Sequence, residues 1–301
     1  CIYTVKNRVF SPDKYEENVL GARSFFIPCS SENVCNAGKS AEQAAISDRV
    51  YTLSGEWDFA YYAEKAPVTF GGEAMQWNTI SLPCSWENSE YEKFRYAHGY
   101  PFKHNLKKFE ISDDEDRKNS VGIYRRVVNV ADNEFESTLS FEKVNGSMEL
   151  QINGEYVGYS MLGTAEFDVT KFLKLGENEI VVIVKKWTPA SFLYGEDGFV
   201  CTGIIGSVRL IKHRKSGLFD YDFSLKRLGA DYLADVKLKF FDNENGTVKV
   251  ELKKDGKTLF ENVCPIKENE AEFVMQNAFT SYNTETSETY DLFIKVVEKN
   301  F

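Results

Sequence analysis

The fold is decided by residues 141–160, which read FEKVNGSMELQINGEYVGYS. Two Asn-Gly pairs, at 145–146 and 153–154, flank the run 148–152. An Asn-Gly pair tolerates the positive φ values that a type I′ hairpin turn requires. We therefore interpret this stretch as a β-strand bounded by two hairpin turns.

The same pattern continues on both sides of this stretch. Further β-branched or aromatic runs predict strands, and two more pairs predict hairpin turns: strands at 121–130, 137–141 and 179–184, and turns at Asn245-Gly246 and Asp255-Gly256. No long amphipathic helix is legible in the pattern. The sequence thus predicts an all-β fold, with β-sandwiches favoured over a closed barrel.

Two runs differ in their polarity and indicate different positions in their sheets. Residues 180–184 are apolar throughout, which predicts a central strand covered on both faces, whereas 248–252 alternate as a strand with one wet face does. Between them lies the basic stretch 212–217, which ends in Ser-Gly. We place a domain boundary there and predict an N-terminal arm (1–50), a first sandwich (51–215) and a second (216–301).

Composition narrows the possible functions and partners. The formal net charge of the 301 residues is −10 and hydrophobic residues make up 43%. An acidic chain repels phosphate backbones, so nucleic acid is not an expected partner, and no run approaches the ~20 apolar residues of a membrane helix. The six cysteines show no paired spacing that would indicate zinc. Reduced thiols, and with them a cytoplasmic location, are the simpler interpretation.

Five segments, taken in order, resemble the sugar-binding domain of family 2 glycoside hydrolases. They are LSGEWDF at 53–59, ISLPCSW at 80–86, GIYRR at 122–126, FEKV with INGEYVG at 141–158, and FDVT with GENEI at 167–180. Within that family, Tyr100-Pro101-Phe102 is similar to the β-galactosidases. Residues 282–285 and 290–292 resemble the end of the immunoglobulin-like domain that follows in the family.

The resemblance implies a fold and a function. The fold would be a jelly-roll sandwich of the galactose-binding-domain type, followed by an immunoglobulin-like sandwich that stops before its final strand. In the family a (β/α)₈ barrel comes next and carries both catalytic glutamates. This chain would therefore be a non-catalytic part of an enzyme that hydrolyses terminal β-galactosides. Its partners would be a galactoside or related sugar and the barrel of the parent enzyme.

The resemblance also points to the site residues. Asp197 matches a family aspartate that binds the sugar and a sodium ion, and a carboxylate suits such a cation. Ala97 stands where the family has a sugar-binding asparagine. The neighbouring His98 is then either its substitute or an ordinary exposed loop residue. Two family arginines are also replaced, by Val200 and Gly206. We expect Asp197 and Ala97 to lie at the same end of the sandwich.

Other residues of these motifs have structural interpretations that need no sugar. Trp57 and Trp86 are expected to anchor the core, because a strand-embedded tryptophan buries a large area. Arg125 and Arg126 are expected to form ion pairs at a strand edge.

No catalytic residue is predicted in this chain, and no cofactor apart from the sodium of a full-length parent. The carboxylates close in sequence, Glu56 with Asp58 and Glu196 with Asp197, have no reason to converge at the ~5–5.5 Å of a retaining glycosidase. Two other functions stay open. A free-standing carbohydrate-binding module would show a surface aromatic strip and sugar affinity of its own. A catalytically dead structural relative would bind no sugar.

Overall fold

The computed structural model describes residues 2–4, 14–35, 47–64, 69–71, 75–97, 119–132, 134–192, 197–228, 231–276, 279 and 288–297. The chain forms two compact units, one of residues 1–21 and 27–212 and the other of residues 22–26 and 213–301. Within the described ranges, no helix is both long and apolar enough to cross a membrane.

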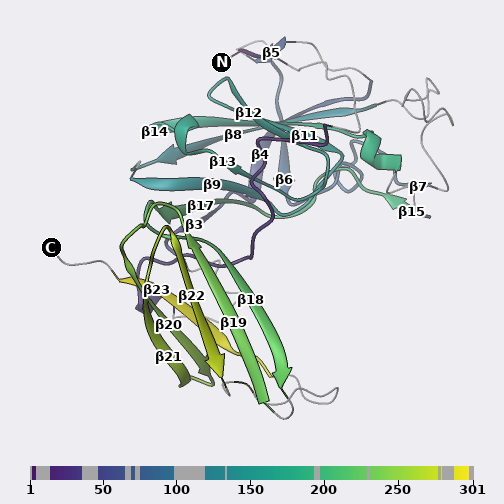
Figure 1. The fold of residues 1–301 in the computed structure, drawn as a ribbon. Helices are drawn as coiled ribbons and strands as arrows, with labels where there is room; N and C mark the ends of the chain where they lie inside the picture. Colours follow the sequence, from purple (N-terminus) through teal and green to yellow (C-terminus); the bar gives the residue numbers. More distant parts are fainter. Residues whose placement is uncertain are drawn as a thin grey trace. The chain divides into compact units, whose positions relative to one another are not determined.

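The first unit is built on a seven-stranded antiparallel sheet (Figure 1). Its strands, in spatial order, are β2 (Glu16–Glu17), β12 (Glu155–Ser160), β11 (Ser147–Ile152), β14 (Gly176–Lys185), β8 (Val121–Val130), β4 (Gly55–Tyr62) and β6 (Asn78–Leu82). Residues 180–184 are buried at every position and lie on β14, between β11 and β8. Their side chains alternate between two separate core clusters, so the prediction of a central strand covered on both faces is confirmed.

A four-stranded sheet completes the first sandwich. Its order is β13 (Ala165–Asp168), β9 (Phe135–Phe141), β17 (Val208–Arg214) and β3 (Val50–Thr52). The core cluster that joins the two sheets includes Trp57, Leu150 and Val182 from the larger sheet and Leu139, Phe167 and Leu210 from the smaller one. Trp57 and Trp86 are 1% and 0% exposed, which confirms their prediction as core anchors.

The first unit also contains short strands and short helical elements outside these two sheets. Three two-stranded pairs are described: β1 (Ile2–Thr4) with β5 (Thr69–Gly71), β10 (Val144–Asn145) with β16 (Gly203–Ile204), and β7 (Arg95–Ala97) with β15 (Gly198–Val200). The helical elements of the described residues are one four-residue helix and two 3₁₀ turns: α1 (Glu32–Cys35), η2 (Thr170–Phe172) and η3 (Pro189–Phe192).

The second unit is a smaller sandwich of two three-stranded antiparallel sheets. One contains β18 (Leu218–Leu228), β19 (Asp231–Phe240) and β22 (Glu270–Gln276), and the other β21 (Lys257–Pro265), β20 (Thr247–Lys254) and β23 (Asp291–Val297). Val248, Val250 and Leu252 are buried while the residues between them are half-buried, as the alternation predicts. The all-β fold of two successive sandwiches is therefore confirmed. The immunoglobulin-like character of the second unit stays a prediction.

Two of the four hairpin turns predicted at Asn-Gly and Asp-Gly pairs are present, and the other two predictions are wrong. Asn153-Gly154 joins β11 to β12 and Asp255-Gly256 joins β20 to β21, all four residues with positive φ. Asn145-Gly146 is not a hairpin turn, because β10 pairs with β16 before the chain enters β11. Asn245-Gly246 is not one either, since it precedes β20 on the crossing from one sheet to the other.

The two motif arginines lie on β8, which is an interior strand and not an edge as predicted. Arg125 forms the expected ion pairs, at 3.0 Å to Asp58 and 2.6 Å to Glu179. Arg126 does not. Its Nη1 donates to the carbonyl oxygens of Leu53, Ser54 and Glu56, and so fixes the chain that enters β4.

The basic stretch at the predicted domain boundary begins with two buried residues. Lys212 and His213 lie at the end of β17 and are 6% and 4% exposed. Lys212 is paired with Asp132 at 2.9 Å, and the ring of His213 contacts Phe26 and Phe241. Phe26 belongs to the segment 22–26 of the N-terminal arm, which is part of the second unit.

Candidate functional site

The two predicted site segments lie side by side. β7 and β15 pair antiparallel, with Gly198 opposite Ala97 and Phe199 opposite Tyr96. Asp197 directly precedes β15 and is exposed. The prediction that Asp197 and Ala97 share one end of the sandwich is therefore confirmed, and the β7–β15 ribbon can be followed in Figure 1. His98 and Glu196 lie outside the described residues.

Backbone contacts fix the chain on the far side of β15. Trp86 N–H donates to the carbonyl of Thr202 at 2.9 Å, and Cys84 N–H donates to that of Ile204 at 3.0 Å. The side-chain amide of Asn145 donates to the carbonyl of Cys201 at 2.9 Å. The segment after Asp197 is thus held against the loop that leads into β7.

Gly203 lets this segment approach the core. A Cβ there would lie 2.7 Å from the hydroxyl of Tyr124 and 2.9 Å from Nε1 of Trp86, and the residue has φ +113°. Nε1 of Trp86 itself donates to Tyr124 Oη at 2.6 Å. Burial raises the pKa of the Tyr124 hydroxyl, so this group stays protonated. Its role is structural.

A buried ion cluster lies beneath the site loops. Lys186, which follows β14, contacts Glu92 and lies 3.7 Å from Glu87, and the side chains of Lys186 and Glu87 are 6% and 1% exposed. Glu87 also accepts hydrogen bonds from the backbone and hydroxyl of Thr202, and Glu92 accepts one from Tyr61. Burial lowers the pKa of the Lys186 ammonium, while Glu87 opposes that effect.

Sequence reasoning missed this cluster. The one available signal was a lysine directly after an apolar strand, and nothing in the sequence marks Glu87 and Glu92 as its partners. Their carboxylates both reach one ammonium, yet they are buried and already paired, so no substrate can bind between them. We assign the cluster to positioning the loops.

Two of the carboxylates considered from the sequence, Glu56 and Asp58, lie on β4. Glu56 is exposed, and Asp58 is paired with Arg125. No group of three or more His, Cys, Asp or Glu side chains that could hold a metal ion occurs in the described part of the chain. A sodium site at Asp197 stays a prediction.

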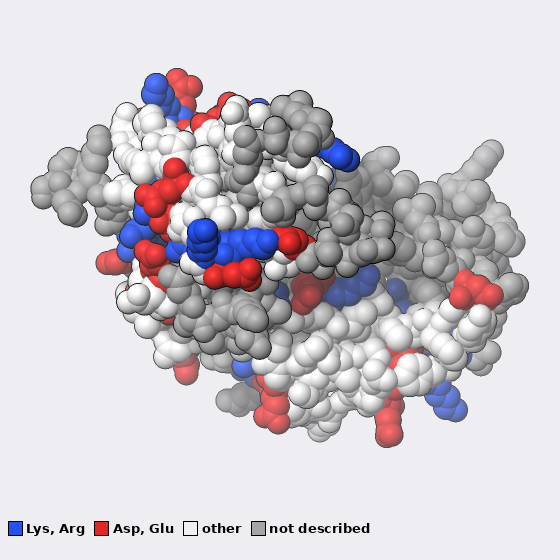
Figure 2. Space-filling model, turned by 90° about the horizontal axis from the view of Figure 1, so that it is seen from below, with Lys and Arg blue, Asp and Glu red and all other residues white. Residues whose placement is uncertain are grey.

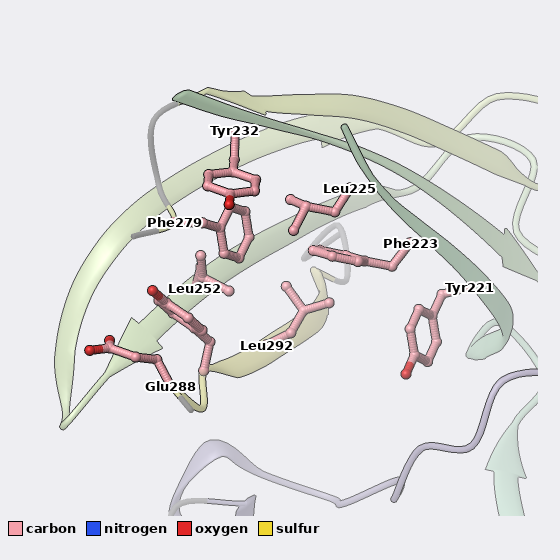
Figure 3. A pocket seen from close by; sticks show the side chains of 9 residues that line it. Tyr221, Phe223, Leu225, Tyr232, Leu252, Phe279, Glu288 and Leu292 are labelled. Atoms are coloured by element: carbon pink, nitrogen blue, oxygen red, sulfur yellow. The ribbon is translucent and has the colours of Figure 1, made fainter. Parts of the chain in front are cut away.

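The second unit contains an apolar pocket of about 470 Å³ (Figure 3). Aromatic and leucine side chains from β18, β19, β20 and β23 line it, together with Glu288, which is paired with Lys254. A sugar site needs several polar groups that converge on hydroxyls. This pocket offers few, so the β7–β15 ribbon is the better candidate.

Charge does not favour a nucleic-acid surface. On the face drawn in Figure 2, Lys and Arg side chains lie among Asp and Glu side chains. Ion pairs of the second unit such as Lys249–Glu251 (2.6 Å) and Lys253–Glu251 (3.2 Å) have the same mixed character. A nucleic-acid footprint instead gathers basic side chains on one face.

Comparison with known families decides the origin of the first sandwich. Residues 50–214 match the model described as "Glycosyl hydrolases family 2, sugar binding domain". The chain belongs to glycosyl hydrolase family 2. That match spans the β7–β15 ribbon and the buried cluster.

Curated relatives include several β-galactosidases. That of Actinobacillus pleuropneumoniae is 29% identical over 215 residues, which are 70% of this chain and 20% of the relative. That of Priestia megaterium (strain DSM 319 / IMG 1521) is 33% identical over 233 residues, 72% of this chain and 21% of the relative. The chain thus spans about a fifth of the length of these enzymes.

Solved structures of family 2 enzymes share the fold. A Bifidobacterium dentium β-glucuronidase complexed with coumarin-3-O-glucuronide has a TM-score of 0.60 at 15% identity, covering 83% of this chain and 45% of that one. A β-D-mannosidase from Dictyoglomus thermophilum has a TM-score of 0.56 at 17% identity, covering 83% and 34%. At these identities the likeness concerns the fold alone.

Proposed function

We propose that this chain is the non-catalytic N-terminal part of a β-galactosidase-like enzyme, which hydrolyses terminal β-galactosides with a barrel domain outside this chain. The observation that supports the proposal is the pairing of Gly198 with Ala97, because Asp197 directly precedes Gly198 and so follows the end of β7 closely in space. The β-galactosidase relatives support the galactoside as substrate.

Asp197 has two roles in this proposal. Its carboxylate accepts hydrogen bonds from sugar hydroxyls, and in the parent enzyme it is one ligand of a sodium ion whose other ligands lie elsewhere. His98 takes over the role of the asparagine that the family carries at the position of Ala97, since imidazole can both donate and accept. The buried Lys186 cluster holds the segment after Asp197 in place. We further propose a cytoplasmic location, in keeping with the free thiols of Cys84, Cys201 and Cys264.

The alternative is a free-standing carbohydrate-binding module, and exposed aromatic rings beside Asp197 favour it as the second candidate. In that case the chain binds sugar by itself and has no barrel partner. A catalytically dead structural relative is the third possibility, and it predicts no sugar binding.

Expression of the reading frame that continues past codon 301 tests the proposal. We expect it to encode a barrel, to hydrolyse a chromogenic β-galactoside, and to lose at least tenfold in kcat/KM in Asp197→Asn, because a charge-assisted hydrogen bond contributes about 1.5–3 kcal/mol. A matched variant, Asp168→Asn, removes an exposed carboxylate from β13 and should leave kcat/KM unchanged. A stop codon near Phe301, or full activity in Asp197→Asn, would contradict the proposal.

A further inference from the structure

Three aromatic side chains form an exposed face on the β7–β15 ribbon. Phe94, Tyr96 and Phe199 are 52%, 58% and 68% exposed. Tyr96 and Phe199 are directly opposed in register with ring centroids 5.3 Å apart, and Phe94 lies 6.4 Å from Phe199. Large aromatic rings usually bury most of their surface, so three adjacent exposed rings indicate a binding surface.

Asp197 is a near neighbour of one of these rings along the chain. It directly precedes β15, in a bend two positions before Phe199, and is exposed. This end of the ribbon therefore carries flat apolar rings and a carboxylate, which are the two chemistries that a pyranose requires: a surface for its C–H groups and an acceptor for its hydroxyls.

Ring geometry limits the size of the ligand. Phe199 is nearly perpendicular to Tyr96 and to Phe94, at 87° and 89°. The three rings are thus not a coplanar strip along which an extended polysaccharide could lie. A corner made by perpendicular rings suits one sugar ring.

We propose that Phe199 and Tyr96 form a stacking corner for a single galactopyranoside whose hydroxyls donate to Asp197. This inference rests on the proposed function and adds the residues that would recognise the apolar side of the sugar. In a galactopyranoside the axial 4-hydroxyl projects from one face of the ring. The opposite face presents the C–H groups of C3, C4 and C5, and this is the face that packs on Phe199.

Saturation-transfer NMR on the intact 301-residue chain with methyl β-D-galactopyranoside tests the proposal. We expect millimolar or weaker affinity, with the strongest saturation at the H3, H4 and H5 protons. Phe199→Ala weakens binding about tenfold, as expected for loss of a stacking contact. Phe199→Leu keeps an apolar side chain without a ring and should show the same loss. Phe25→Ala removes a ring that is 64% exposed elsewhere and should change nothing.

Other outcomes would overturn the stacking corner. If Asp197→Asn abolishes binding while Phe199→Ala leaves it unchanged, the proposed function stands and the stacking corner is wrong. Absence of saturation transfer in the folded wild type up to about 0.1 M sugar also overturns it, whereas the proposed function is judged separately by the activity of the longer reading frame. A dimer that forms with concentration and is lost in Phe199→Ala would assign the face to a second copy of the chain instead.

Discussion

Trp57 fills the centre of the first sandwich, and its indole Nε1 donates to the carbonyl of Leu53 at 2.7 Å. We expect Trp57→Ala to lower the free energy of unfolding by about 3–5 kcal/mol, the range for removal of a large core aromatic. Denaturant titration measures this change, with Leu175→Ala, at a side chain that is 58% exposed, as the matched control. An unfolding midpoint that does not move would show that the indole is not packed in the core.

At Gly122 the core leaves no space for a side chain. A Cβ at this position would lie 2.6 Å from Cζ2 of Trp86 and 2.8 Å from Cε2 of Phe59, both buried rings. We expect Gly122→Ala to destabilise the chain by about 1–3 kcal/mol through overpacking. Gly21→Ala is the control, because a Cβ at Gly21 meets no atom within 4 Å. Equal unfolding midpoints for the two variants would refute the close approach.

His213 makes stability depend on pH. Burial, and to a smaller extent the charge of Arg23, lowers the pKa of His213 from 6.5 to about 3. Among the described residues its Nε2 has no hydrogen-bond partner. Between about pH 6.5 and 3 only the unfolded state takes up the proton, so stability falls as the pH falls, by about 1.4 kcal/mol per pH unit.

The measurement is the free energy of unfolding at pH 7 and pH 5, in the wild type and in His213→Phe. Other groups titrate in both proteins, so the difference between them isolates the histidine. We expect the wild type to lose about 2 kcal/mol more than the variant on acidification. Identical losses would mean that His213 is protonated in the folded state.

At the scale of elements, Lys186 joins the end of β14 to the loop between β6 and β7 through Glu87 and Glu92. Lys186→Met leaves both carboxylates in a buried place without their cation. We expect a loss of about 3–5 kcal/mol in the free energy of unfolding, the cost of breaking a buried ion pair from one side.

The double variant Lys186→Met with Glu87→Gln controls for this charge imbalance. It removes one buried charge along with the lysine and should recover part of the loss. Additive losses from the two substitutions would show that Lys186 and Glu87 do not interact.

Strand positions were predictable from local pattern, whereas partners were not. The β-branched run Val121–Val130 coincides with β8, because alternation and β-branching act within a strand. The predictions of hairpin turns at Asn145-Gly146 and Asn245-Gly246 were wrong, because an Asn-Gly pair also suits an irregular connection between strands that are not hairpin partners. The type of connection depends on pairings between strands far apart in the sequence, such as that of β10 with β16.

The residues of the candidate site were likewise only partly predictable from the sequence. Asp197 and the Ala97 loop could be brought together through the family resemblance. The exposed rings at Phe94 and Phe199, and the burial of Lys186 and His213, follow from tertiary packing. No periodicity distinguishes a buried lysine from one at the surface.

At the scale of the whole molecule, the first of the two sandwiches carries the β7–β15 ribbon, and we predict that the chain holds no catalytic pair of carboxylates. The chain spans about a fifth of its β-galactosidase relatives. A retaining glycosidase requires an acid and a nucleophile about 5–5.5 Å apart across the scissile bond. We therefore propose that the hydrolytic chemistry of the parent enzyme belongs to a barrel outside this chain.

Turnover of a chromogenic β-galactoside by the purified 301-residue chain tests this division most directly. The control is the same preparation from a host strain without its own β-galactosidase, together with an Asp197→Asn chain. We predict no turnover above the uncatalysed rate in either protein. Sustained turnover by the pure wild-type chain, carried through successive purification steps, would contradict the assignment and place a catalytic pair within these 301 residues.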